Sequence, residues 1–154
     1  MAFEHEIKLR VGSLDVVRAR LRDTAAGLRQ AATFEDNWVL DDDARRIGAA
    51  GCLLRVRRWG EAAVTLELLA ALGFTPWRRY QKRREVWELH GVAVALDETP
   101  MGCFVELEGV PESIGIAAKE LGLQPGDAVS GTYLHLWEEF RAAHPEAPAD
   151  MVFS

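Results

Sequence analysis

Charged and apolar residues alternate in several segments of this chain that have the character of β-strands. The first segment spans residues 4–10, and its charged positions are Glu4, Glu6, Lys8 and Arg10. Successive side chains of a strand point to opposite faces of a sheet. These four charges therefore share one face, and the intervening Ile7 and Leu9 point to the other.

Three further segments repeat like charges two residues apart. They are the pairs Arg55 and Arg57, Lys82 and Arg84, and Glu106 and Glu108. Like charges on one face repel each other unless an opposite charge lies between them. Paired carboxylates therefore favour a divalent cation, and paired basic residues favour a polyanion. For any one strand, an ordinary solvated face of an antiparallel sheet explains the same alternation.

Composition narrows the class of protein. The chain has 154 residues, of which 49% are hydrophobic and 27% charged, as in soluble globular domains. A formal net charge of −6 argues against a dedicated nucleic-acid binder, and fifteen of the eighteen basic residues are arginines, which suit phosphate. No apolar run is long enough to span a membrane. We expect no signal peptide, since a strand begins almost at Met1, and we expect Cys52 and Cys103 to be buried thiols of a cytoplasmic protein.

Periodicity predicts the order of the elements. Strands are expected over residues 3–11, 33–41, 52–59, 62–66, 80–89, 92–97 and 103–108, and helices over residues 14–30, 67–72, 113–121 and in the segment after Ser130. Two prolines, Pro145 and Pro148, follow the last helix. We therefore predict one domain over residues 1–144 and a loose C-terminal tail over residues 145–154.

Taken together, residues 3 to about 133 resemble the CYTH family, also called triphosphate tunnel metalloenzymes. The matching motifs are Glu-x-Glu-x-Lys at residues 4–8, Asp41 at the end of the second strand, Gly-x-x-Leu-Arg-x-Arg at residues 51–57, the basic strand Lys82-Arg83-Arg84-Glu85, and Phe-Val-Glu-x-Glu at residues 104–108. The ordered set of motifs is specific, although many amphipathic strands would match the first motif alone.

The resemblance implies an α+β fold, in which an antiparallel eight-stranded β-barrel with flanking helices forms a tunnel lined by the charged faces. It implies metal-dependent hydrolysis of a triphosphate, either inorganic tripolyphosphate or a small organic triphosphate such as thiamine triphosphate, with Mg²⁺ or Mn²⁺ as cofactor. Two alternatives stay open: a class IV adenylate cyclase that makes cyclic AMP from ATP, and a non-catalytic polyphosphate-binding module. The sequence does not determine the oligomeric state, for which a homodimer is one possibility.

The same resemblance assigns roles to residues. Metal ligands would be Glu4, Glu6, Asp97, Glu106 and Glu108, and phosphate would be bound by Arg55, Arg57, Lys82 and Arg84, with Arg10 as a further contact. Lys8, together with Glu4 and Glu6, is assigned to catalysis. Lys8 would either contact phosphate or orient the attacking water, and the sequence does not decide between these two roles.

One departure from the family pattern concerns residues 65–69. The family has a longer segment before the helix that ends at Gly73, whereas here Thr65-Leu66 leads directly into residues 67–72. A barrel without those strands would have two open edges with unpaired backbone groups. We therefore predict a barrel that is incomplete near residues 65–69, because a stretch between Thr65 and Leu69 is missing from the sequence.

Overall fold

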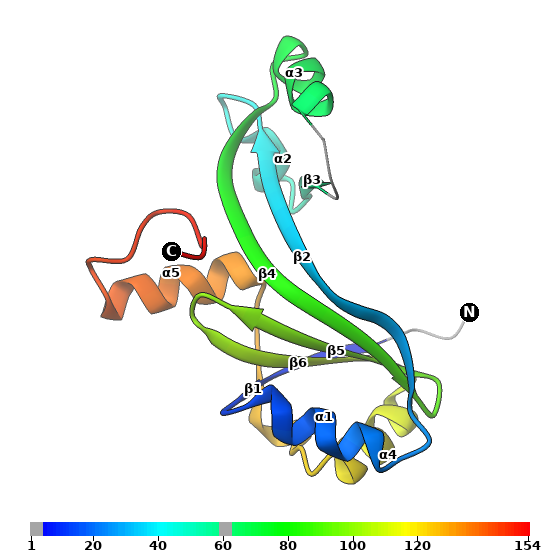
Figure 1. Ribbon diagram of the computed structural model, residues 1–154. Helices are drawn as coiled ribbons and strands as arrows, with labels where there is room; N and C mark the ends of the chain where they lie inside the picture. Colours follow the sequence, from blue (N-terminus) through cyan, green and yellow to red (C-terminus); the bar gives the residue numbers. More distant parts are fainter. Residues whose placement is uncertain (1–4, 59–62) are drawn as a thin grey trace. The chain divides into compact units, whose positions relative to one another are not determined.

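The structure is a computed structural model that describes residues 5–58 and 63–154. Glu4, a predicted metal ligand, lies outside the described residues, as does the predicted turn at residues 60–61. The fold is α+β with an antiparallel sheet of seven strands among the described residues, so the predicted class is confirmed (Figure 1). Within the same residues, no helix is both long enough and apolar enough to span a membrane.

The strands follow one another in the sheet in the order β3-β2-β4-β5-β6-β1-β7. Their bounds are β1 (His5–Val11), β2 (Gly27–Asp41), β3 (Leu54–Arg58), β4 (Thr75–Leu89), β5 (Val92–Thr99), β6 (Gly102–Gly109) and β7 (Ala128–Val129). The helices are α1 (Leu14–Arg22), α2 (Arg46–Ala49), α3 (Ala63–Ala71), α4 (Pro111–Glu120) and α5 (Tyr133–Ala143), with a 3₁₀ turn η1 (Pro125–Asp127).

The chain divides into two compact units. Unit 1 comprises the residues up to Thr33 together with Arg83–Thr132, and unit 2 comprises Phe34–Lys82 together with Tyr133–Ser154. The boundary passes through the middle of two long strands, β2 and β4. The assignment of residues 1–144 to a single domain stays a prediction.

Unit 1 is built on the alternation seen in the sequence. The apolar face of β1, β5 and β6 packs against α1 and α4, which lie on the same side of these strands (Figure 1). Leu9, Val105 and Leu107 are fully or almost fully buried there, and Ile7 packs against them. The opposite face of these strands carries the charged residues, as the sequence predicts.

A two-residue turn joins β4 to β5. Leu89 pairs with Val92, and the residues between them, His90 and Gly91, have φ angles of 55° and 74°. Positive φ at both central residues is the signature of the type I′ turn, whose twist matches that of an antiparallel hairpin. The turn predicted at His90-Gly91 is therefore confirmed.

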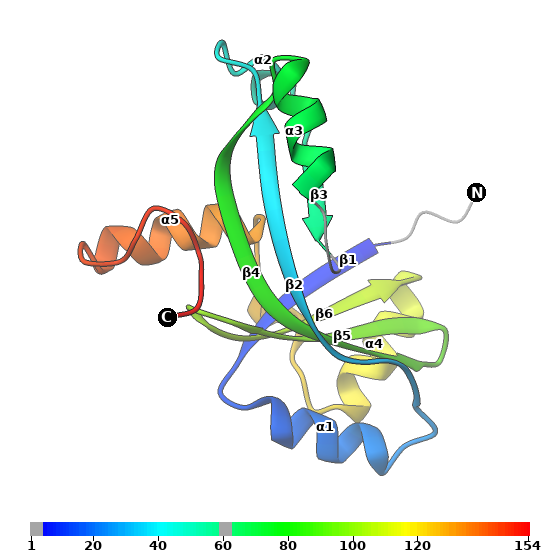
Figure 2. The same ribbon diagram turned by 45° about the horizontal axis from the view of Figure 1, so that its top comes forward.

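Unit 2 contains the second charged strand pair. β3 pairs with β2 so that Arg57 lies opposite Asn37 and Arg55 opposite Val39. The two arginines share one face, and Val56, opposite Trp38, lies on the other. Figure 2 shows α2 and α3 at the end of β2 where β4 begins.

The C-terminal residues are not the loose tail that we predicted. Met151 is fully buried, and its backbone exchanges hydrogen bonds with β4, donating to Arg79 O at 3.1 Å and accepting from Gln81 N at 2.7 Å. Trp137 also donates its indole N–H to Pro148 O at 3.3 Å. The two prolines prevent α5 from continuing, but burial of Met151 holds the residues after them against β4.

The predicted helix over residues 14–30 is correct only in its first half. Ser13 caps α1 by accepting a hydrogen bond from Asp15 N, but the helix ends at Arg22 and β2 begins at Gly27. Thr24 donates its hydroxyl to Leu21 O and accepts from Ala26 N, and such local side-chain bonds compete with helix continuation.

The strand predicted over residues 62–66 is wrong, because residues 63–71 form helix α3. Alanine, leucine and glutamate dominate this stretch and are strong helix formers. The helix ends at Ala71, and the following Gly73 has a φ of 88° that allows a Schellman motif, with hydrogen bonds from Gly73 N to Ala70 O and from Phe74 N to Leu69 O. The helix is continuous from residue 65 to residue 69, and the stretch that we expect to be missing there stays a prediction.

The two cysteines are less buried than predicted. Cys52 is exposed and Cys103 is half-buried, and both are free thiols. Burial raises the pKa of the Cys103 thiol, with a smaller contribution from the carboxylate of Glu98. A raised thiol pKa lowers the thiolate fraction and hence the reactivity of Cys103.

Asp41 anchors the end of β2. It accepts hydrogen bonds from the backbone N–H groups of Asp42, Ile47 and Gly48 at 2.8, 3.0 and 3.0 Å. Desolvation alone would raise the pKa of Asp41, but the three N–H donors together hold the pKa below its ordinary value of 3.8. The charged carboxylate therefore fastens α2 to the strand end.

The first prediction concerns the core of unit 1. Leu107→Ala removes a side chain with no exposed surface and should lower the free energy of unfolding by about 2–5 kcal/mol. Leu28→Ala is the matched control, because Leu28 is 51% exposed and should change stability by less than about 0.5 kcal/mol. Urea unfolding measures the free energy of unfolding of both variants. An equal loss of stability in the two variants would contradict the location of the core at Leu107.

The second prediction concerns acid. A depressed pKa stabilises the folded state above the unfolded pKa, and this contribution is lost as the pH falls through the lower folded pKa. The difference in melting temperature between wild type and Asp41→Asn should therefore be constant from pH 7 to about pH 4 and shrink below it. Asp43→Asn, at an exposed neighbour, should show no such narrowing. If the melting temperature of the wild type exceeded that of Asp41→Asn by a growing amount as the pH fell, the stabilising role of the charged Asp41 carboxylate would be refuted.

Candidate functional site

The acidic segments at the two ends of unit 1 meet on one face of its sheet. Glu6 lies opposite Glu108, and Lys8 lies opposite Glu106, in the register of β1 and β6. Neighbouring strands continue the face, because Ala95 lies opposite Glu106 and Arg84 lies opposite Asp97. The charged members of this face are Glu6, Lys8, Arg10, Arg84, Asp97, Glu106 and Glu108. The register thus brings Glu6, Glu106 and Glu108 to one face, as expected for residues a hundred positions apart, whereas the metal-binding roles of these residues stay predictions.

Glu106 is the centre of this charged face. Its carboxylate is largely buried and lies between two cations, with Lys8 Nζ 3.1 Å from Oε1 and Arg84 Nη2 hydrogen-bonded to Oε2. A buried carboxylate requires such partners, because an unpaired charge would carry a large desolvation penalty. Residues predicted to bind metal and phosphate therefore bind each other in this structure.

Asp97 completes the cluster and has no exposed surface. Arg84 donates to it through two nitrogens, Nε to Oδ1 at 2.7 Å and Nη2 to Oδ2 at 2.5 Å. This paired geometry matches the planar fork of a guanidinium to the two oxygens of a carboxylate. Arg84 is consequently held in one orientation by β5 while it also contacts Glu106 on β6.

Lys8 has further partners on its other side. Its ammonium donates to Gly131 O at 3.3 Å and lies 3.7 Å from Glu6 Oε1. β7, which the sequence did not predict, pairs with β1 at Lys8 and Leu9 and brings Gly131 to this position. Glu6, Ile7 and Lys8 line a hollow of about 360 Å³ together with residues 128–131.

The remaining predicted residues of this face lie at its margins. Glu108 is exposed and borders a shallow hollow of about 300 Å³ that Arg29 and Glu88 also line. Arg10 donates to Met101 O at 3.0 Å, and its guanidinium carbon lies 4.8 Å from the centre of the Phe104 ring.

The donor chemistry of this face suits Mg²⁺ or Mn²⁺, since both ions prefer oxygen ligands and carboxylates are the acidic groups present. Within residues 5–58 and 63–154, however, no three His, Cys, Asp or Glu side chains form a group that could hold a metal ion. Glu4 is not among these residues. In the described geometry the carboxylates of Glu106 and Asp97 are neutralised by Arg84 and Lys8 instead.

The other predicted phosphate ligands lie in unit 2. Arg57 Nη1 is 3.1 Å from Glu35 Oε1, and Arg57 Nε donates to Asn37 Oδ1 at 3.1 Å. Arg55 Nη1 donates to the hydroxyl of Tyr80 at 2.8 Å. Lys82 is almost fully buried, with its ammonium 4.8 Å from the centre of the Tyr133 ring.

Sequence reasoning missed Glu35 and Asn37. Both lie on β2 and point to the face that carries Arg57, and both are buried. The signal was available in the sequence, because Glu35, Asn37 and Asp41 occupy alternate positions of a predicted strand. Neither residue has a like-charged neighbour two positions away, the feature that singled out Arg57, Lys82 and Glu106.

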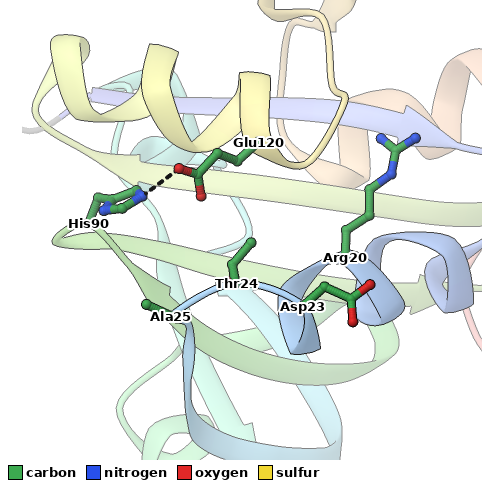
Figure 3. A pocket seen from close by; sticks show the side chains of 6 residues that line it. All are labelled: Arg20, Asp23, Thr24, Ala25, His90 and Glu120. Atoms are coloured by element: carbon green, nitrogen blue, oxygen red, sulfur yellow. Dashed lines mark hydrogen bonds and ion pairs between the residues drawn. The ribbon is translucent and has the colours of Figure 1, made fainter.

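A separate hollow lies on the helical side of unit 1 (Figure 3). It has a volume of about 490 Å³ and is lined by Arg20, Asp23, Thr24, Ala25, His90 and Glu120. His90 Nε2 is 3.0 Å from Glu120 Oε1 across it, and Arg20 donates to Leu121 O at 2.5 Å. Its polar groups are exposed and belong to helix ends and a turn, so we regard it as a surface feature.

Comparison with known proteins supports the fold. No family model matches the chain, and no curated protein matches its sequence. A provisionally assigned adenylate cyclase from Vibrio parahaemolyticus has a similar structure, with a TM-score of 0.78 and 18% identity over 88% of this chain and 98% of that chain. A protein from Pyrococcus horikoshii matches with a TM-score of 0.67 and 20% identity over 90% and 100% of the two chains.

A third similar structure has a described activity. A provisionally assigned adenylyl cyclase from Hippeastrum, reported to have a dominant triphosphatase activity, matches with a TM-score of 0.64 and 16% identity over 90% of this chain and 96% of that chain. The resemblance inferred from the sequence is thus confirmed at the level of the fold. At these identities the likeness shows the fold alone.

The third prediction tests the buried pair. Asp97→Asn leaves Arg84 without its fully buried counter-ion and should cost about 3–5 kcal/mol of folding free energy. Glu98→Gln is the matched control, because the neighbouring Glu98 forms a half-exposed pair with Arg83 and should cost only about 0–1 kcal/mol. Chemical denaturation compares the two variants, and a cost below that of Glu98→Gln would show that Asp97 and Arg84 are not coupled.

Proposed function

We propose that this protein is a divalent-metal-dependent triphosphatase that hydrolyses inorganic tripolyphosphate or a small organic triphosphate such as thiamine triphosphate. The observation that carries the proposal is the Glu106 cluster, in which carboxylates and cations from four strands meet on one face. The fold shared with the Hippeastrum triphosphatase supports the same reaction class.

The carboxylates are the proposed metal ligands. Glu106, Glu6 and Glu108 share one face of β1 and β6, with Glu4 and Asp97 as further ligands. A metal ion bound there would polarise a phosphoryl oxygen of the substrate. Glu6 lies 3.7 Å from Lys8, and 51% of its side chain is exposed, so this proposed ligand is accessible to solvent.

The cations are the proposed phosphate ligands. Arg55, Arg57, Lys82 and Arg84 would neutralise phosphate oxygens, and the two-nitrogen fork of arginine fits phosphate as it fits carboxylate. Hydrolysis of a triphosphate is limited by charge and alignment, so preorganised cations lower its barrier. Lys8, held by Glu106 and Gly131 O, would contact phosphate or orient the attacking water. Arg10, at the margin, is a weaker contact.

A second function, cyclisation of ATP, is favoured by one observation. Two of the similar structures belong to provisionally assigned cyclases, from Vibrio parahaemolyticus and Hippeastrum. We rank hydrolysis first because no adenine pocket is recognisable in the sequence. Binding of polyphosphate without turnover is the third possibility.

Several finer points of this proposal stay predictions. One is that the sheet closes into an eight-stranded barrel whose charged faces line a tunnel. The others are a cytoplasmic location, a homodimer, and the absence of nucleic-acid and membrane partners. The strand that we expected at residues 62–66 does not contribute to such a barrel, because α3 replaces it.

The fourth prediction tests the proposed metal ligand. Glu106→Gln keeps the size of the side chain and removes its charge. Substitution of a residue that only supports a metal ligand lowers activity by roughly 10–100-fold. Because Glu106 is proposed to bind the metal itself, turnover of tripolyphosphate with Mg²⁺ or Mn²⁺ should fall by more than this. Glu85→Gln is the matched control. Glu85 is equally buried, at 8% exposure, but pairs with Arg18 on the helical side, so this variant should lose stability and keep its turnover.

Product analysis decides between the three functions. The purified protein is assayed with tripolyphosphate, thiamine triphosphate and ATP, with each metal and with a chelator. Phosphate release that requires metal supports the proposal, pyrophosphate with cyclic AMP supports the cyclase, and binding without product supports the polyphosphate-binding module. Full activity of Glu106→Gln would refute the assignment of Glu106.

A further inference from the structure

Glu35 on β2 is a carboxylate that the proposed reaction does not yet use. Only 1% of its surface is exposed. A buried carboxylate is costly unless oppositely charged groups lie beside it. Its neighbours therefore indicate why the fold keeps a charge at this position.

Both neighbours of Glu35 are proposed phosphate ligands from other strands. Arg57 Nη1 of β3 lies 3.1 Å from Oε1, and Lys82 Nζ of β4 lies 3.8 Å from Oε2. Oε2 accepts no hydrogen bond among the described residues. Glu35 thus stands between two cations, close enough to Lys82 to attract it without being hydrogen-bonded to it.

The orientation of Arg57 is fixed from β2 at two points. Glu35 faces its Nη1, and Asn37, two residues along the same strand face, accepts from its Nε at 3.1 Å. Asn37 in turn donates to Tyr80 O on β4 at 3.4 Å. A guanidinium held through two different nitrogens cannot rotate freely, so its remaining edge has a defined direction.

A metal-binding role for Glu35 is disfavoured by its surroundings. The charged groups beside it are Arg57 and Lys82, and no cluster of acidic or histidine ligands includes it within residues 5–58 and 63–154. A cation would have to enter next to two positive charges. Attraction between Glu35 and the two side chains is the role that these contacts support.

We propose that Glu35 is a positioning residue that sets the spacing and orientation of Arg57 and Lys82 for the phosphate groups of the substrate. This inference rests on the proposed function, because it assigns Arg57 and Lys82 to a triphosphate. Without a carboxylate between them, the two cations repel each other and lose the preorganisation on which electrostatic catalysis depends. Glu35 itself does not touch the substrate.

Glu35→Gln is the central variant. The amide keeps the size of the side chain but turns an N–H₂ donor, in place of an attracting oxygen, toward Arg57 or Lys82. The Michaelis constant for tripolyphosphate with Mg²⁺ should rise by roughly 10–100-fold, the range typical of supporting residues, while kcat changes much less. Calorimetric titration of the metal-free protein with tripolyphosphate should show the same loss of affinity, independently of turnover.

Asp36→Asn provides the matched control. Asp36 is the next residue of β2, is also buried, and is held by Arg79 through two hydrogen bonds of 2.8 and 2.7 Å on the opposite face. Arg79 has no part in the proposed reaction. Asp36→Asn should lower the melting temperature but leave the Michaelis constant unchanged, which separates positioning from a general loss of stability.

A shorter carboxylate tests the same idea if Glu35→Gln does not fold. Glu35→Asp keeps the charge but withdraws it from Arg57 and Lys82, and it should raise the Michaelis constant in the same direction by a smaller factor. Unchanged binding of tripolyphosphate in either folded variant overturns the inference. Tighter binding overturns it as well, because it would mean that the negative charge of Glu35 only weakens anion binding. Wild-type protein that neither binds nor hydrolyses tripolyphosphate, thiamine triphosphate or ATP refutes the proposed function itself, and the inference with it.

Discussion

The ion pair between Arg84 and Asp97 is the interaction on which the charged face of unit 1 depends. Asp97 has no exposed surface, and the fork of Arg84 satisfies both of its oxygens. The same guanidinium reaches Glu106, which Lys8 approaches from β1. Four strands are thus joined by side chains across a face on which every charge needs a partner. The buried carboxylates of Asp97 and Glu106 are neutralised by Arg84 and Lys8, so a ligand that binds them must replace existing ion pairs.

Exchange of partners favours ligands with several charges. A single phosphate offers too little to compensate for separating Arg84 or Lys8 from a buried carboxylate, because breaking such a pair costs several kcal/mol. A metal ion together with a polyphosphate supplies both signs of charge at once, so that carboxylates and cations each find a new partner. In unit 2, Glu35 gives Arg57 and Lys82 the same kind of internal counter-ion.

Much of the fold could be predicted from alternation alone. The period of two residues located β1, β3, β4, β5 and β6 and the face on which each charge lies, because burial of one face constrains every second residue. Alternation failed where local propensity was stronger, as in α3, whose alanines and leucines override the two β-formers Val64 and Thr65. It also failed for β7, since two residues are too few to show a period.

Parts of the candidate site were beyond the reach of the sequence. The pairing of like charges led to Glu106, Arg57 and Lys82 but not to Glu35, whose function as a counter-ion is visible only when three strands are side by side. Likewise, the sequence could not show that Arg84 binds the two predicted metal ligands, Asp97 and Glu106. Contacts between distant segments depend on register, which no local pattern specifies.

The two-residue turn at His90-Gly91 also bears on the order of folding. It begins a run of consecutive hairpins, β4-β5-β6, whose pairings join residues near each other in the chain. β1 pairs with β6 across about a hundred residues, and closing so large a loop has a higher entropic cost. We expect the hairpins to form first and to bring Arg84, Asp97 and Glu106 together early. Lys8 would then arrive last, so the cluster acquires its fourth strand only when the chain is nearly native.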